Sequence, residues 1–212
     1  MEKPPLLIDE PMNPWIKRSP IILLLICLSA QAALKVPTLE TERCILRPLS
    51  LDDAPGIFSL ASDPEIARYT TMFGATLHQD QRATREFIER CLKMSYGGYG
   101  MAWVILEKYS GTLIGMMSVF GYSMIHRKAE FGYALSPAYW GMGIMTEVSK
   151  ALIAFAFTEL NLVRLQATVD PENISSERVL QKCGMQYEGL LHNYYIVNDA
   201  CCNRAMYALT QK

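Results

Sequence analysis

Short stretches in which apolar and polar residues alternate run through most of this 212-residue chain. Alternation with a period of two predicts β-strands, whereas apolar residues three and four positions apart predict helices. Strands are expected at 43–49, 101–107, 112–120, 128–135, 165–169, 186–197 and 202–210, and helices at 50–61, 76–94 and 148–160. The order of these elements predicts an α+β fold in which helices flank a mixed, twisted β-sheet.

A short polar segment late in the chain carries the start and stop signals of one more helix. The preceding strand is expected to end at Asp170 and Pro171, and Asn173 or Ser175 is a residue type that caps helix N-termini. Gly184 is expected to end the helix in a left-handed conformation, which glycine adopts without steric cost.

Composition and charge exclude two classes of partner. The net charge is −1 and the chain has no cluster of Lys and Arg, so nothing favours binding to nucleic-acid phosphates. Six cysteines show no C-x-x-C spacing and three histidines are scattered, so no metal site is expected. In a chain of this length the cysteines are expected to be small buried thiols in a reducing compartment.

The first 38 residues differ in composition from the rest. A basic pair, a short apolar run and small residues follow one another, which is the pattern of a secretory signal. The uncharged stretch 19–34 is short for a membrane span, and the acidic, proline-rich residues 1–16 are a long preface for a signal. We expect an N-terminal extension at 1–38 and the main domain at 39–212. A signal or anchor, an extended start and an added packing segment remain alternatives for the extension.

The segment 139–147 lies between a predicted strand and a predicted helix and contains two closely spaced glycines, Gly141 and Gly143. The first amides of a helix lack intrahelical partners and carry the positive end of the helix dipole, so such a turn favours phosphate. The chain has no G-x-x-x-x-G-K-[ST] motif. Thr146 occupies the third position after Gly143, so the dinucleotide motif G-x-G-x-x-G is also absent.

This turn resembles the pyrophosphate loop Q/R-x-x-G-x-G/A of the GCN5-related N-acetyltransferases (GNAT). The resemblance is closest to the ribosomal-protein and N-terminal acetylating subgroup, in which the loop commonly reads Y-W-G-x-G. Trp140 stands at the Q/R position and Met145 at the G/A position, and both depart from the general pattern.

A second motif follows in the right order. Residues 170–185 resemble the family segment that begins D-P-x-N-x-x-S-x-x-[VL] and ends G-F, with Met185 where Phe is usual. The match in order and spacing extends from about Leu39 to Leu209, which is most of the chain.

The resemblance implies that acetyl-coenzyme A (acetyl-CoA) binds in a cleft where the sheet splays between the strand before the loop and the strand 165–169. It also implies that a backbone amide near the end of the first of these strands stabilises the oxyanion. Asn173 would hydrogen-bond the coenzyme or the substrate, and capping a helix is an alternative role that is compatible with this one. The implied cofactor-binding residues are Ala134, Leu135, Trp140, Gly141, Met142, Gly143, Ile144, Met145, Thr146 and Asn173.

An amine must lose a proton before it attacks a thioester, so the reaction needs a base. Glu130 is the candidate, because a carboxylate in an apolar strand loses solvent and becomes a better proton acceptor. A solvent-facing or ion-paired Glu130 is the alternative. Many family members use a Tyr as acid where this chain has Leu180, and Ser176 is the nearest substitute by spacing. Direct transfer in a ternary complex requires no cysteine nucleophile.

The acceptor is expected to be a primary amine, with the N-terminal α-amine of a protein or peptide favoured. An α-amine has a pKa of ~7.7–8 and is partly neutral at pH 7, whereas lysine at ~10.4 is almost wholly protonated. Small-molecule amines (polyamine, antibiotic or amino sugar), a non-catalytic acyl-CoA sensor and a membrane-associated binding module remain alternatives. We expect a cytoplasmic monomer or homodimer with no nucleic-acid partner and no metal, and a membrane partner is not favoured.

Overall fold

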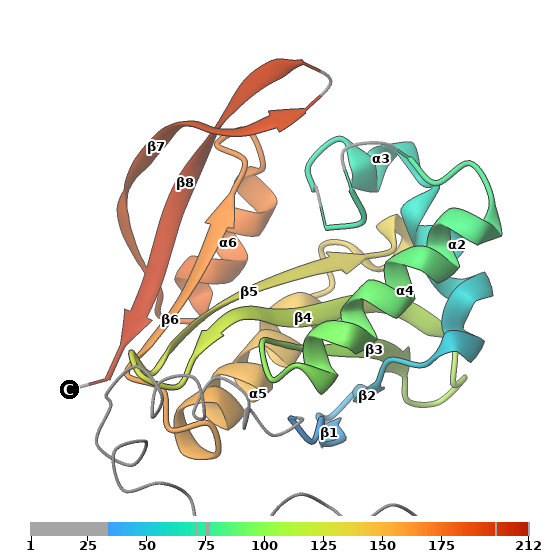
Figure 1. Ribbon diagram of the computed structural model, residues 1–212, viewed down its shortest axis with the longest axis horizontal. Coiled ribbons are helices and arrows are strands. Elements are labelled where there is room, and N and C mark those ends of the chain that lie inside the picture. Colours follow the sequence, from blue (N-terminus) through green and yellow to red (C-terminus); the bar gives the residue numbers. More distant parts are fainter. Residues whose placement is uncertain (1–33, 71, 75–76, 198, 212) are drawn as a thin grey trace, which may run out of the picture. The chain divides into compact units, whose positions relative to one another are not determined.

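Most of the sheet is built from antiparallel neighbours, and one parallel pair interrupts them. The computed structural model describes residues 34–70, 72–74, 77–197 and 199–211. The strands are β1 (Leu39–Glu40), β2 (Cys44–Pro48), β3 (Met101–Glu107), β4 (Leu113–Ser123), β5 (Lys128–Leu135), β6 (Arg164–Val169), β7 (Gln186–Val197) and β8 (Ala200–Thr210). They form an eight-stranded sheet in the order β1-β2-β3-β4-β5-β6-β8-β7, and within the described residues β5 and β6 are the parallel pair (Figure 1). The predicted mixed α+β fold is confirmed.

The helices are η2 (Leu51–Asp53), α2 (Ala54–Ala61), α3 (Pro64–Ala67), α4 (Gln81–Tyr96), η3 (Pro137–Tyr139), α5 (Ile144–Thr158) and α6 (Ile174–Lys182). Short polar side chains cap the N-termini of η2, α3, α4 and α6. The prediction that the second helix begins at residue 76 is wrong, because the side chain of Asp80 accepts a hydrogen bond from the amide of Ala83 (2.9 Å) and starts α4 there. The four-residue helix α3 was not predicted, and Asp63 caps it.

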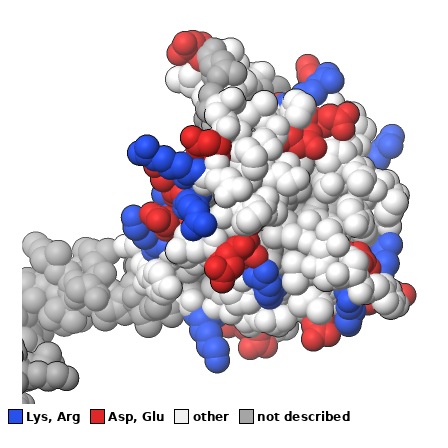
Figure 2. Space-filling view, turned by 90° about the vertical axis from the view of Figure 1, so that its right-hand side faces the viewer, with Lys and Arg blue, Asp and Glu red and all other residues white. Residues whose placement is uncertain are grey.

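Charged side chains of both signs are interspersed on the face shown in Figure 2, with uncharged surface between them. Such mixing produces no large field of one sign over this face.

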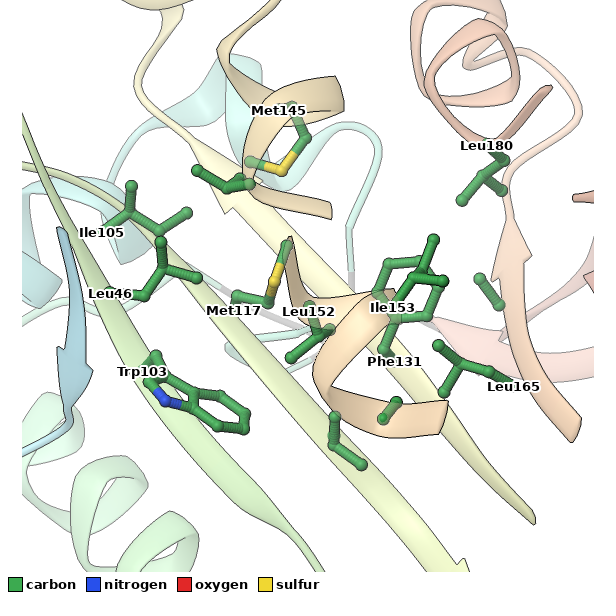
Figure 3. Close-up of a cluster of buried hydrophobic side chains, with 14 of the residues drawn as sticks. Leu46, Trp103, Ile105, Met117, Phe131, Met145, Leu152, Ile153, Leu165 and Leu180 are labelled. Atoms are coloured by element: carbon green, nitrogen blue, oxygen red, sulfur yellow. The ribbon is translucent and has the colours of Figure 1, made fainter. Parts of the chain in front are cut away.

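Helices cover both faces of the first five strands, and the alternation of side chains along β3 shows how. Trp103 and Ile105 point to the face covered by α5, whereas Ala102 and Val104 point to the face covered by α2 and α4. Figure 3 shows the first of these two cores, in which Trp103 lies beneath side chains of α5. Each large side chain buried in this way contributes about 1.5–3 kcal/mol to folding, so the two cores fix the positions of β3, β4 and β5.

The sheet splays between β5 and β6. Three residues of β5 pair with β6, from Lys128 opposite Arg164 to Glu130 opposite Gln166. Beyond Glu130, β5 continues along β4, whereas β6 continues along β8. The splay expected between these strands is therefore confirmed, and it leaves one side of the second half of β5 without a strand partner.

The first described residues already contact the domain. The amide of Leu34 donates to the carbonyl oxygen of Ser95 (3.1 Å), and the indole N–H of Trp103 donates to the carbonyl oxygen of Pro37 (2.7 Å). The boundary at residue 39 stays a prediction. Among the described helices none is long and apolar enough to cross a membrane, and the apolar run considered as a signal lies in residues 1–33, outside the described part.

We predict that a chain truncated to begin at Ala33 folds cooperatively, whereas a chain truncated to begin at Leu39 is less stable. The second truncation removes the carbonyl of Pro37, and the fully buried Trp103 then has an N–H without an acceptor. The free energy of unfolding should fall by about 1–3 kcal/mol relative to the first truncation. Urea unfolding of both chains measures this difference, and equal stability would contradict it.

Candidate active site

The glycine turn before α5 is built by two left-handed residues. Gly141 has φ 76° and Gly143 has φ 77°, a region that residues with a Cβ enter at a steric cost. Gly143 is the N-cap, and the first hydrogen bond of α5 runs from the amide of Glu147 to its carbonyl (3.1 Å). Among the described residues no side chain caps this helix. The amides of 144–146 are therefore available to an anion, as predicted for a phosphate loop.

Arg43, at the start of β2, clamps the loop to the helix that follows it. Its Nη1 donates to the carbonyl oxygen of Met142 (2.8 Å), its Nε to Glu147 Oε2 (2.7 Å) and its backbone amide to Glu147 Oε1 (2.9 Å). Partial burial of Glu147 favours a higher pKa of its carboxyl. Hydrogen bonds from Thr41 and Arg43 outweigh this effect and hold the pKa below its usual value. Sequence reasoning missed Arg43, because it lies 104 residues from Glu147.

Trp140 anchors the loop to the end of β5. Its indole N–H donates to the carbonyl oxygen of Leu135 (2.8 Å), so the ring is held against the strand although it remains partly exposed. Ile144 and Met145 bury their side chains in the core, and Figure 3 shows Met145 there. These two residues can therefore offer a ligand only their backbone, whereas Met142 is exposed.

The hydrogen-bonding register of β5 separates the two candidates for the oxyanion amide. The amide of Ser136 donates to the carbonyl oxygen of Ile114 (2.8 Å), and in antiparallel sheets such pairs recur at every second residue. Ala134, opposite Met116, is therefore hydrogen-bonded toward β4. The backbone of Leu135 points to the other side of the strand, into the gap left by β6.

A cleft of about 370 Å³ occupies this gap and is lined from both faces of the sheet. Phe87 and Cys91 of α4 line it on one face, and Ser176 and Leu180 of α6 line it on the other. The cleft therefore passes through the splayed sheet between β5 and β6. Two ligands can reach its centre from opposite faces.

Glu130 lies at the point where β5 and β6 separate, and its side chain lines the cleft. It is 9% exposed and accepts hydrogen bonds from Thr168 Oγ1 (2.9 Å) and Gln166 Nε2 (3.2 Å). Both donors are neutral, and among the described residues Glu130 forms no ion pair. The alternatives of a solvent-facing or ion-paired residue are therefore wrong.

Ser176 lies on the α6 side of the cleft and is linked across it to Tyr133 of β5. The two hydroxyl oxygens are 2.8 Å apart, and the amide of Ser176 donates to Asn173 Oδ1 (3.0 Å). Asn173 is thus the N-cap of α6, so its alternative role as a cap is confirmed. Burial raises the pKa of Tyr133 far above its usual range, and the phenol keeps its proton. Sequence reasoning missed Tyr133, although its position two residues before Leu135 on the same strand face was a usable signal.

Leu180 offers no acid, and Cys91 and Cys183 offer little thiolate. Leu180 is 1% exposed and packs in the core. Burial raises the pKa of the Cys91 thiol to about 11, and also that of Cys183 to about 11, so thiolates are scarce at neutral pH. No group of His, Cys, Asp and Glu in the described residues is placed to hold a metal ion.

Comparison with known proteins identifies the family of this chain. Residues 43–186 match the family described as "Acetyltransferase (GNAT) domain". The "Uncharacterized N-acetyltransferase p20" of Bacillus licheniformis is 34% identical over 82% of this chain and 97% of its own length. The spermidine N(1)-acetyltransferase of Escherichia coli K12 is 26% identical over 71% of this chain and 77% of its own.

Solved structures share the fold. The structure of RimL, a ribosomal L7/L12 α-N-protein acetyltransferase in complex with coenzyme A, aligns with a TM-score of 0.74 at 19% identity, covering 82% of this chain and 98% of that one. An acetyltransferase of the GNAT family from Bacillus anthracis aligns with a TM-score of 0.70 at 24% identity, covering 82% and 98%.

We predict that Arg43→Met loosens the loop without unfolding the domain. Its contacts are partly exposed, so their loss should cost about 1 kcal/mol and speed hydrogen exchange of the Glu147 amide, which donates to the carbonyl of Gly143, about fivefold. Lys108→Met is the control, since it removes the exposed ion pair with Glu40 (3.1 Å). Equal exchange rates of the Glu147 amide in the two variants would show that Arg43 does not hold the loop.

Proposed function

Since the chain belongs to the GNAT acetyltransferase family and is an acyltransferase that acts on amines, we propose that acetyl-CoA binds at the loop 140–146 and that the acceptor is the α-amine of a protein or peptide. The observation that carries the proposal is a cleft that passes through the splayed sheet and is lined by Glu130, a buried carboxylate without a cationic partner in the described residues. One face of the sheet then serves the acyl donor and the other serves the amine.

The loop fits a diphosphate. The amides of 144–146 have no cap, and the space where Gly141 would carry a Cβ is open. Acetyl-CoA supplies the reactive thioester when it is bound. The chain supplies the N–H groups that hold the diphosphate and the clamp from Arg43 that keeps them aligned.

Glu130 is the proposed base. An amine arrives as an ammonium ion, and a carboxylate without a cationic partner in a buried cleft both attracts the ion and accepts its proton, directly or through a water molecule. Thr168 and Gln166 orient the carboxylate and leave its negative charge uncompensated.

Leu135 is the proposed donor to the thioester oxygen, in preference to Ala134. Its amide faces the gap, whereas that of Ala134 is directed toward β4. Trp140 holds the carbonyl of Leu135 and so restrains this end of the strand. A fixed N–H at the site where negative charge develops lowers the barrier because it needs no reorganisation.

Tyr133 and Ser176 together are the proposed donors to the departing sulfur. The phenol retains its proton at neutral pH and is already hydrogen-bonded to Ser176, so the pair can solvate a developing thiolate. Leu180 has no proton to give, and the assignment extends the expectation that named Ser176 alone.

Two findings support different acceptors. The structural similarity to RimL, a ribosomal L7/L12 α-N-protein acetyltransferase, supports a protein amine, as does the higher neutral fraction of an α-amine at pH 7. The similarity to a spermidine acetyltransferase supports a small polyamine as the second candidate.

We predict that Gly143→Val weakens coenzyme A binding at least tenfold. A β-branched residue at φ 77° costs about 1–3 kcal/mol and displaces the amides that follow it. Gly111→Val is the matched control, because Gly111 has φ 69° in open space in the β3–β4 turn. Calorimetric titration with coenzyme A should distinguish the variants, and parental affinity in Gly143→Val would place the site elsewhere.

We predict that Glu130→Gln lowers kcat at pH 7 about 100-fold or more, because general base catalysis typically supplies about 10²–10⁴-fold. The residual rate should still rise with pH through the α-amine pKa of ~7.7–8, since solvent then removes the proton. Glu188→Gln is the control, because Glu188 pairs with Arg164 outside the cleft. Steady-state kinetics with a peptide acceptor measures kcat and its pH dependence for both variants. An unchanged kcat in Glu130→Gln would remove Glu130 from the mechanism.

A further inference from the structure

The charges that line the cleft match a single positive charge on the ligand. The charged residues among those that line it are Glu130, Asp170 and Arg204. Arg204 is 6% exposed and its Nη1 donates to Asp170 Oδ2 (3.0 Å), so these two neutralise each other. Glu130 is left as the carboxylate without a cation in the described part of the cleft.

Part of the cleft wall on the Glu130 side of the sheet is apolar, although the hydroxyl groups of Tyr69, Thr70, Ser118 and Tyr195 also line the cleft. Phe87, Cys91 and Met94 recur at the spacing of one face of α4 and line the cleft together with Met72 and Phe120. Glu130 shares its sheet face with these residues, because even-numbered positions of β5 point to the side of α2 and α4. A ligand whose amine reaches Glu130 from this face therefore lies against aromatic and thioether side chains.

The wall is held in place from behind. The ring of Phe73 packs against that of Phe87 at 5.3 Å between centroids. Buried His78 links Phe73 to α4, since its Nε2 lies 2.9 Å from the carbonyl oxygen of Phe73 and its Nδ1 lies 2.9 Å from Oγ1 of Thr84 in α4. The apolar surface is therefore formed before a ligand arrives, and a ligand that buries apolar area on it does not have to order it.

We infer that the acceptor is a monoamine with an apolar group next to the amine, which for a peptide means an apolar first residue such as Met, Leu or Phe. The inference rests on the proposed transfer to an amine in this cleft. A second ammonium, as in a polyamine or an N-terminal lysine, would lie against the apolar wall without a carboxylate. An unpaired charge in such surroundings is costly.

The test is a panel of peptides that differ only at the first residue (Met, Leu, Phe, Ser, Asp or Lys), together with phenethylamine and spermidine, each assayed with acetyl-CoA. Peptides that begin with Met, Leu or Phe should have kcat/KM at least about tenfold above those that begin with Ser, Asp or Lys, as expected from the burial of one apolar side chain. Spermidine should be the poorest acceptor.

The outcomes separate this inference from the proposed function. Transfer to phenethylamine but to no peptide overturns the protein acceptor and supports the inference. Transfer to all peptides regardless of the first residue overturns the inference and leaves the protein acceptor standing. A preference for spermidine overturns both, as does transfer to no amine at all.

A variant tests the wall itself. Met94→Glu adds a carboxylate to the wall of the cleft that Glu130 also lines. The substitution should lower kcat/KM for the Met peptide at least tenfold and raise the ratio of kcat/KM for the Lys peptide to that for the Met peptide. Ile125→Glu is the control, because Ile125 is 82% exposed in the β4–β5 turn and does not line the cleft. An unchanged ratio in a Met94→Glu variant that melts like the parent overturns the inference, and the panel with the parent chain decides the question if the variant does not fold.

Discussion

A parallel pairing that ends after three residues opens the sheet at the cleft that we propose as the active site. Backbone amides in a sheet are normally satisfied by a neighbouring strand, and an amide left without one costs free energy unless something else binds it. When β6 leaves β5 at Glu130, the second half of β5 keeps β4 on one side and faces a cleft on the other. The carbonyl of Leu135 is satisfied by Trp140, while its amide points away from β4. The unpaired edge is thus a cost in stability, and we propose that ligand binding offsets this cost.

The two ends of this edge are held by contacts that come from distant parts of the sequence. Arg43 ties the loop and the first turn of α5 to β2, and the hydrogen bond between Tyr133 and Ser176 ties β5 to α6. Each contact restrains a group that a substrate would have to meet in a fixed position. A site supported in this way loses little free energy to ordering when ligands bind.

The sequence predicted those features that depend on local pattern. Alternation located the strands to within a few residues, and capping residues located α6 with Asn173 at its start and Gly184, at φ 83°, after its end. The start of α4 was missed because the polar residues before Asp80 fit a helical pattern as well as a loop. Arg43 and Tyr133 act through partners 104 and 43 residues away, and the direction of the Leu135 amide depends on the register with β4. No periodicity in a single sequence carries such information.

The apolar wall of α4 and the glycine loop lie on opposite faces of one sheet, and this separation has an evolutionary consequence. Residues 87, 91 and 94 can be exchanged without contact with the loop, and the loop can be preserved while they change. If the proposed sites are correct, a lineage with this architecture can acquire new acceptors through substitutions on one helix, at no expense to the half of the molecule that is proposed to hold the donor. The sheet therefore separates the residues proposed to hold the donor from those proposed to contact the acceptor.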